Sequence, residues 1–324
     1  MTLAVSGRLA RVLAALQRRR NETILPALMV LIALGAGVVE PRFLTLDNLI
    51  NLARQIVPLL IISVGQAFAL ISAGLDLSLA AVMSMSGVVG IIVMKNFGIA
   101  AGIGAMLITG TTAGFASGFI IAYFRTTPLL VTLGMLSVAQ ACALILSNGT
   151  PIYDVPENYA QQIGFETFIG IPWSVWIAAL TTLAGWFLLQ HTVFGRYVYA
   201  VGSNASAALR SGVEVGRTIM LVYAMSGLCS GICAVVFTAW VGSAQPIAAP
   251  NLTLESLAAV VLGGVALTGG SGSMLNVIYG VTMLSMLSNV MNMTGVSAYF
   301  QTLIIGIVII LAVVLDRIRR RDGN

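Results

Sequence analysis

Charged residues are scarce along this chain of 324 residues. Only 8% of the residues are Asp, Glu, Lys or Arg, whereas 58% are hydrophobic. A soluble domain carries about a quarter charged residues, so a water-soluble globular protein is excluded. The tracts 96–124, 218–254 and 256–315 contain no charged residue at all, and about 20 apolar residues suffice to cross a bilayer. The composition therefore predicts an all-α integral membrane protein.

Histidine and lysine are nearly absent, which excludes several kinds of active site. His191, the only histidine, lies at a predicted helix end and is expected at the membrane interface, so no histidine is available for a catalytic triad, and no His/Glu metal cluster is present. The glycine-rich GGSGS at 269–273 lacks the Gly-Lys-Ser/Thr ending of a phosphate-binding loop, and Lys95 is the only lysine. We expect no catalytic residue, no metal site and no cofactor bound by this chain, which is then not an enzyme.

Acidic residues are also rare inside the apolar tracts. Asp76, within LISAGLDLSLAAV (70–82), is the only charged residue between Arg54 and Lys95. Ion-coupled carriers use buried acidic residues to bind or relay the coupling ion. A transporter with so few of them and no ATP site is expected to take its energy from a partner. An ion-coupled secondary carrier, a channel and an intramembrane enzyme remain as alternatives.

Proline, glycine, charged and polar clusters divide the apolar tracts into ten candidate spans. Their even number puts both termini on one side of the membrane. Of the basic residues, 13 fall on that side and three on the other, so both termini are expected in the cytoplasm. The spans are predicted at 24–41, 54–73, 77–94, 100–123, 129–147, 173–190, 218–240, 254–268, 274–293 and 298–316.

One transmembrane domain, 24–316, is expected between a basic cytoplasmic segment, 1–23, and a basic cytoplasmic tail, 317–324. The arginines of both ends suit anionic lipid headgroups and not nucleic acid. The first apolar run has no small-residue cleavage site, so the N-terminal segment is expected to be retained. The stretch FLTLDNLINLARQ, 43–55, has apolar residues three or four apart and predicts a short amphipathic helix on the outer interface.

Two regularities concern the packing of the spans. After the first span the remaining nine group as four, one and four, and the two groups of four have opposite orientation, as in an inverted repeat. Glycines also recur at a spacing of four, which lets helix backbones approach closely in lipid. We expect these glycines to build a compact bundle, with a face for a second subunit as the alternative. They are Gly110, Gly114, Gly118, Gly227 and Gly231.

The cytoplasmic loop 191–217 is long enough to contain a helix. Ser203 or Asn204 can cap its start, ASAALR contains strong helix formers, and Gly212 is placed to end it. Such a helix of about two turns is either a docking site for a partner or an ordinary interfacial loop helix. Its spacing alone leaves both interpretations open.

Six stretches, taken together, resemble a known family. In family order, and over nearly the whole chain beyond residue 24, the sequence resembles the permease subunits of ribose and simple-sugar ATP-binding-cassette importers, in the superfamily of branched-chain amino acid and ribose permeases. The family usually has two glycines and an isoleucine before Asp-Leu-Ser, where this chain has Ala73, Gly74 and Leu75. The family also often has two acidic residues before its later double glycine, and this chain keeps only one of them, at Glu255. The stretches are AGLDLSLAAVMSMSG (73–87), TPLLVTLGMLS (127–137), GRYVYAVGSNASAALRSGV (195–213), YAMSGL (223–228), GSAQP (242–246) and LAAVVLGGVALTGGSGS (257–273).

The resemblance implies a ten-helix fold like that of the vitamin B12 importer's permease, placed in the bacterial inner membrane. It also implies three partners: a separate ATPase subunit that uses ATP and magnesium, a periplasmic sugar-binding protein, and a second permease copy or paralogue. The loop 191–217 would contain the coupling helix that meets the ATPase. The positions that the resemblance assigns to coupling are Gly195, Arg196, Gly202, Asn204, Ala205, Arg210 and Gly212.

Polar residues within the apolar spans are the candidates for the translocation pathway or its gates. We favour Asp76 as the cap of the helix that follows it, with Ser78 as a first-turn hydroxyl, while direct contact of Asp76 with a sugar stays open. The amides of Gln66, Asn289 and Asn292 either line the pathway or join helices. Gln245 and Glu255 are expected near the outer mouth, where the binding protein would dock.

The sequence thus favours the permease subunit of an ATP-driven importer for a pentose or hexose, working by alternating access. The same architecture importing a branched-chain amino acid or another small polar solute is the nearest alternative.

Overall fold

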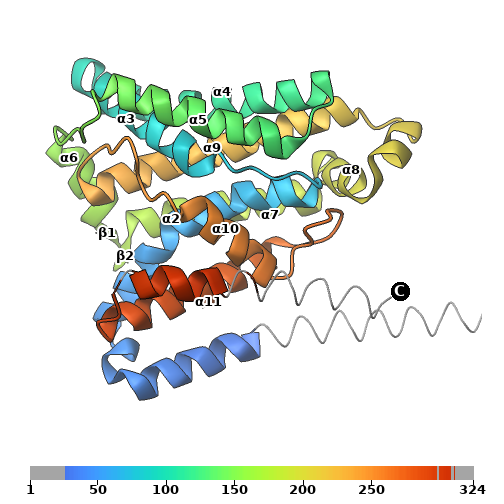
Figure 1. Ribbon diagram of the computed structural model, residues 1–324. Helices are drawn as coiled ribbons and strands as arrows, with labels where there is room; N and C mark the ends of the chain where they lie inside the picture. The colour runs from blue at the N-terminus through green and yellow to red at the C-terminus, as the bar shows by residue number, and fades with distance from the viewer. Residues whose placement is uncertain (1–25, 298, 308–309, 311–324) are drawn as a thin grey trace, which may run out of the picture.

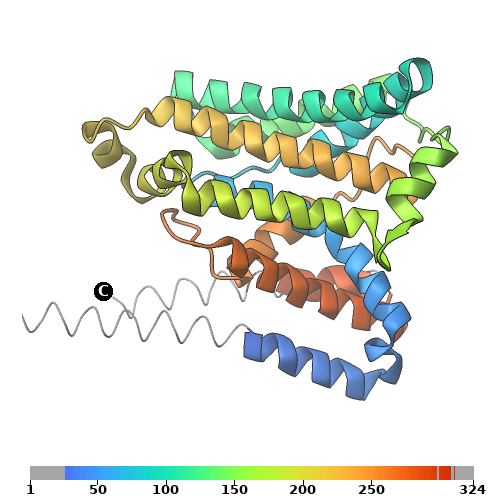
Figure 2. The same ribbon diagram turned by 180° about the vertical axis from the view of Figure 1, so that it is seen from behind.

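The computed structural model describes residues 26–297, 299–307 and 310, and within these residues the chain is almost entirely helical. Figures 1 and 2 show long helices packed side by side in one bundle. A short apolar helix, Pro26–Val39, comes first. It is followed by η1 (Pro41–Leu44), α2 (Leu46–Ile71), α3 (Leu79–Phe97), α4 (Ile99–Phe124), α5 (Pro128–Leu146), α6 (Glu157–Tyr159), η2 (Ala160–Phe165), β1 (Thr167–Phe168), β2 (Ile171–Pro172), α7 (Trp173–His191), α8 (Val193–Arg210), α9 (Val215–Val241), α10 (Leu252–Leu262) and α11 (Met274–Met293).

Seven helices in the described residues are long and apolar enough to cross a membrane, namely α2, α3, α4, α5, α7, α9 and α11. Each of them overlaps a predicted span. The prediction at 254–268 is wrong in extent, because α10 has only 11 residues and its glycine-rich continuation is not helical. The predicted span 24–41 contains only the short helix Pro26–Val39, and 298–316 lies largely outside the described residues.

The separate amphipathic helix predicted at 43–55 does not form. Instead, α2 begins at Leu46 and continues to Ile71 without a break, although Pro58 lies inside it. Leu52 is buried with Phe43 and Ala36 in a small cluster of its own. This stretch is therefore held by packing on the preceding segment, and no glycine or proline between Leu46 and Arg54 interrupts the helix.

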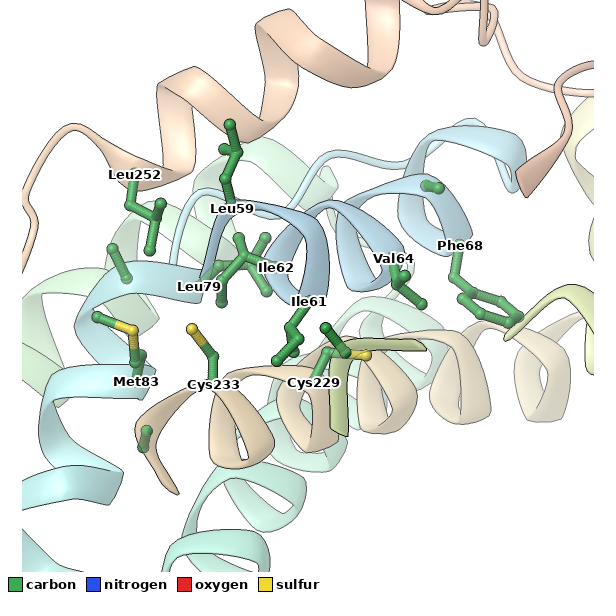
Figure 3. Packing of buried hydrophobic residues seen from close by; sticks show 14 of the residues in the cluster. Leu59, Ile61, Ile62, Val64, Phe68, Leu79, Met83, Cys229, Cys233 and Leu252 are labelled. Carbon is green, nitrogen blue, oxygen red and sulfur yellow. The ribbon is translucent and has the colours of Figure 1, made fainter. Parts of the chain in front are cut away.

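The hydrophobic core surrounds α2, whose apolar side chains are largely buried. Figure 3 shows Ile61 of α2 beside Cys229 of α9, and Ile62 near Leu79 of α3 and Leu252 of α10. Cys229 is buried and free, so it packs as a small apolar side chain. Within the described residues α2 contacts α3, α7, α8, α9, α10 and α11, so it lies at the centre of the bundle.

The glycines spaced by four pack α4 against α9, as predicted. A Cβ built on Gly114 would collide with the Tyr223 carbonyl oxygen and lie 2.9 Å from Gly227 Cα. A Cβ on Gly118 would lie 2.9 Å from Met220 Cα. The two backbones are therefore in direct contact, which only small residues allow.

Two long helices are each followed by a non-helical segment and then by a helix that begins inside the bundle. The 26-residue α2 leads through 72–78 into α3, and the 27-residue α9 leads through 242–251 into α10. In Figure 1 the segment after α2 doubles back along the bundle before α3 begins. The starts of α3 and α10 meet, because the Ala80 N–H donates to Thr253 Oγ1 at 3.0 Å.

Candidate functional site

Asp76 lies in the non-helical segment between α2 and α3, and it is 2% exposed. Its Oδ1 accepts hydrogen bonds from the Ser78 N–H (3.0 Å) and the Ser78 hydroxyl (2.7 Å), and its Oδ2 accepts one from the Ser226 hydroxyl (2.7 Å). Ser78 itself occupies the N-cap position of α3. Asp76 was expected to be the N-cap itself, but it lies two residues before the N-cap residue, Ser78. Its carboxylate still holds the start of α3 through these hydrogen bonds.

The hydrogen-bond partners around Asp76 place it well inside the bundle. Its partner Ser226 is near the middle of α9, and not at either end. The neighbouring Leu75 carbonyl accepts hydrogen bonds from the Tyr223 hydroxyl (3.2 Å) and from the Thr132 hydroxyl (3.3 Å). Non-helical backbone at membrane depth is tolerated only where protein or water satisfies it, and here α5 and α9 supply the partners.

A cavity of about 320 Å³ lies where α3 and α10 begin. Most of its lining is aliphatic, and its polar side chains are Ser84 of α3, Gln140 of α5 and Thr253 of α10. The Ser84 hydroxyl accepts from the Ala248 N–H at 3.0 Å, so it ties the segment before α10 to α3. Gln140 is a polar residue in an apolar span, the same signal that selected Gln66, and the sequence reading missed it.

Thr253 caps α3 from a different helix, and this gives a testable effect. Thr253→Val keeps the shape of the side chain but leaves the buried Ala80 N–H without its acceptor, so we expect a loss of about 1–3 kcal/mol of unfolding free energy. The measurement is denaturant unfolding of the purified protein in detergent.

The control for this variant is Thr111→Val in α4. The Thr111 hydroxyl bonds only the Leu107 carbonyl of its own helix, so its loss is expected to cost less than about 0.5 kcal/mol. Equal costs for the two substitutions would contradict the capping role of Thr253.

The predicted pathway amides have different surroundings. Gln66 is fully buried in α2, and both its amide atoms lack a partner among the described residues. Asn289 of α11 donates to Asn48 Oδ1 and to Gln55 Oε1, both at 3.3 Å, and so joins α11 to α2. Asn292 Oδ1 accepts from Gln301 Nε2 at 2.7 Å.

The loop predicted at 191–217 is more helical than expected. The expected two-turn helix after Ser203 is the second half of α8, which begins at Val193 and is bent at Asn204 (φ −163°, ψ 99°). Asn204 Oδ1 accepts from the Ala207 N–H at 2.9 Å, so it caps this second half as expected. Leu209 is 62% exposed, and Figure 1 shows α8 at one end of the bundle.

Gly202 of α8 lies at a junction of three segments. A Cβ built on it would collide with the Ile71 carbonyl oxygen at the end of α2 and lie 2.7 Å from the Gly270 N–H nitrogen. The Gly270 N–H in turn donates to that same Ile71 carbonyl at 2.8 Å. The glycine-rich loop 263–273 thus joins α10 to α11, and it also connects α8 with α2.

A tyrosine strengthens this junction. The Tyr199 hydroxyl of α8 donates to the Gly272 carbonyl at 2.8 Å. Burial raises the pKa of Tyr199, so the hydroxyl stays protonated and remains a donor.

The other predicted coupling residues lie along α8 and its ends. Gly195 is buried where a Cβ would collide with the Leu188 and Leu189 carbonyls, and Gly212 ends the segment with φ +83°. Arg196, Ala205 and Arg210 are exposed.

On the opposite side of the bundle, Gln245 lies in the segment between α9 and α10, and Glu255 lies in the first turn of α10. Both are partly buried, and the Gln245 amide lies 3.5 Å from Ser243 Oγ. The neighbouring Ala244 pairs with Ile152 of the loop before α6. The same loop is held by Lys95 Nζ, 2.7 Å from Asp154 Oδ2, and this hydrogen bond lowers the pKa of Asp154.

The described part of the chain contains no group of three His, Cys, Asp or Glu residues placed to hold a metal ion. What the structure brings together are hydroxyls, one carboxylate and crowded glycines.

Comparison with known proteins identifies the family. Residues 48–313 match the family described as branched-chain amino acid transport system / permease component. The chain is 34% identical to the ribose import permease protein of Escherichia coli (strain K12), covering 97% of this chain and 98% of that protein. It is 31% identical to the D-allose transport system permease protein of the same strain, over 90% of each chain.

A third relative is the L-arabinose ABC transporter permease protein of Azospirillum brasilense, 33% identical over 87% of this chain and 83% of that protein. No solved structure matches the chain at a significant level. Such coverage, together with seven apolar helices, places the protein in a membrane as a multi-pass permease. The chain belongs to the family of branched-chain amino acid transport system permease components.

Proposed function

We propose that the protein is the permease subunit of an ATP-driven importer that carries a monosaccharide across the bacterial inner membrane. The relatives named above transport ribose, allose or arabinose by name, and each matches this chain over most of its length. Two of these sugars are pentoses and one is a hexose. The class of substrate is therefore a neutral pentose or hexose.

The observation that carries the coupling mechanism is the contact of Gly202 with Ile71 and Gly270. In the proposed mechanism a separate ATPase subunit, using ATP and magnesium, binds the exposed second half of α8 around Leu209 and Arg210. The first half of α8 rests on the end of α2 and on the loop before α11, without space between the backbones. Rotation of α8 would therefore move α2 and α11 together, which opens the pathway to each side in turn.

The pathway residues proposed are Asp76 and Ser78 at the break, with Gln66 on α2 nearby in sequence. Of these, Gln66 is buried and its amide atoms lack partners among the described residues, which suits a solute that brings its own hydroxyls. Asn289 and Asn292 remain candidates for gates, because their bonds join helices that would move. Gln245 and Glu255 are proposed to face the periplasmic sugar-binding protein.

The architecture proposed is that of ten spans, with both termini in the cytoplasm and two copies or paralogues forming the transporter. The likeness to the vitamin B12 importer's permease and the inverted repeat belong to this proposal. The repeat is supported by the common plan of α2 with α3 and of α9 with α10, each a long helix, a non-helical segment and a helix that begins inside the bundle.

Reconstituted transport tests the function. The full chain is placed in vesicles with its cognate ATPase subunit and sugar-binding protein, and uptake of labelled ribose, arabinose and allose is measured. We expect uptake that requires ATP on the side of the membrane where the ATPase subunit is bound. Uptake should stop when the phosphate-loop lysine of the ATPase is replaced.

Two outcomes would overturn the proposal. One is uptake driven by an ion gradient in vesicles that lack the ATPase, which would indicate a secondary carrier. The other is a binding protein that thermal-shift profiling shows to bind leucine and no sugar, which would select the amino acid alternative.

A further inference from the structure

A second hollow lies on the face formed by α2, α7 and α11, with a volume of about 520 Å³. We call it the α7 groove. Figure 2 shows α7 and α11 running alongside each other on this face of the molecule. Its lining includes Leu60 of α2, Ala179, Thr182, Leu183 and Trp186 of α7, and Ile278 of α11.

The lining of the α7 groove is suited to hydrocarbon. Its only hydroxyl belongs to Thr182, and that hydroxyl already donates to the Ala178 carbonyl of the same helix at 2.7 Å. A polar solute entering the groove would lose its hydration without gaining comparable hydrogen bonds, which is costly. The groove is therefore separate in chemistry from the cavity between α3 and α10, which contains Ser84, Gln140 and Thr253.

The helices that line the α7 groove indicate that it faces the lipid bilayer. All three helices that line it are among those long and apolar enough to cross the membrane. On α7 the apolar side chains next to the groove are exposed, with Leu180 at 69%, Leu183 at 58% and Phe187 at 55%. The exposed Trp173 and Trp176 mark the first turn of the helix, as tryptophan does at membrane interfaces. The groove thus continues an apolar surface that faces the hydrocarbon of the bilayer.

We propose that the α7 groove binds one acyl chain of a bilayer phospholipid. The chain would lie between α7 and α11 against Leu60 of α2, fill the volume that the helices leave, and displace no water from a polar group. This inference goes beyond the transport function and rests only on the placement of the helices in the membrane.

Photolabelling tests the site. The full chain is reconstituted in vesicles of phosphatidylethanolamine and phosphatidylglycerol that contain a trace of phosphatidylglycerol with a diazirine on its acyl chain. After illumination, labelled peptides are mapped by mass spectrometry. We expect saturable labelling around Leu183 and Ile278 that exceeds labelling of Leu180 on the open face of α7.

A groove-filling variant supplies the matched comparison. Ala179→Trp places a ring in the groove, and labelling there is expected to fall roughly tenfold, which corresponds to about 1.4 kcal/mol of binding free energy. Leu180→Trp adds the same ring outside the groove and is expected to leave the labelling unchanged. Should Ala179→Trp fail to fold, Leu275→Phe at the α11 rim replaces it, with the same loss expected.

Three results would overturn the proposal. The first is labelling of the groove that is equal to that of Leu180 and not saturable, as for bulk lipid. The second is an intermolecular disulfide formed by Leu183→Cys, which would show that a second copy covers the groove. The third is a groove that gives no lipid photoproduct and that cross-links instead to the C-terminal segment of the same chain.

Discussion

Gly202→Val is expected to cause a large loss of ATP-driven uptake. The added side chain has no space, because even a Cβ would collide with the Ile71 carbonyl and press on the Gly270 nitrogen. Backbone atoms cannot give way as a flexible side chain does, and overpacking costs about 1–3 kcal/mol or more. The hydrogen bond from the Gly270 N–H to the Ile71 carbonyl would break, and α8 would lose its close contact with the end of α2. We expect a fall in uptake of at least about tenfold.

The measurement is ATPase activity stimulated by the sugar-loaded binding protein, in parallel with uptake. The coupling hypothesis predicts that stimulation is lost while the affinity of the binding protein for its sugar stays unchanged. Gly216→Ala is the control, since a Cβ there would lie 3.8 Å from Ala122 Cβ, an ordinary contact. Helical alanine is also favoured over glycine by about 1 kcal/mol.

A second variant separates loss of coupling from loss of folding. Arg210 is exposed, so Arg210→Ala is expected to leave the unfolding free energy unchanged while it lowers the stimulated ATPase activity. Normal stimulation in both Gly202→Val and Arg210→Ala would refute the assignment of α8 to coupling.

Asp76→Ala is expected to destabilise the protein by about 3 kcal/mol or more. The substitution leaves the Ser78 N–H, the Ser78 hydroxyl and the Ser226 hydroxyl without their acceptor in a site that is almost completely buried. Each buried donor that loses its partner costs about 1–3 kcal/mol. The start of α3 would lose its order, and uptake would fall with it. Unfolding in detergent and uptake in vesicles measure the two effects.

Asp76→Asn distinguishes a structural role from contact with the solute. Asparagine keeps an oxygen for Ser78, and the Ser226 hydroxyl can rotate to accept from the new amide, so we expect less than half of the alanine cost. Ser226→Ala, which removes only one partner, is the matched control. A folded Asp76→Asn protein with normal uptake supports the capping role, whereas loss of uptake without loss of stability would show that the carboxylate touches the sugar.

The sequence predicted the helices that are long and uniformly apolar. The spans around α4, α5, α9 and α11 were located to within a few residues, because each is bounded by charge, proline or glycine. The contact of α4 with α9 was also visible as glycines spaced by four. The prediction failed where helix length depends on neighbours, as for α10, which stops after 11 residues, and for α2, which absorbs the segment from Leu46.

By itself the sequence determined that this is a membrane protein with no phosphate-loop motif and few acidic residues in its apolar tracts. Composition and motifs can be read without knowing which residues are in contact. The sequence also marked Asp76, Asn204 and Gly202 as special positions. Only the tertiary structure decided what they touch: Ser226 for Asp76, and Ile71 with Gly270 for Gly202. These contacts join residues 68 to 150 positions apart in the chain, and no local pattern encodes which backbone will lie against a glycine once helices pack.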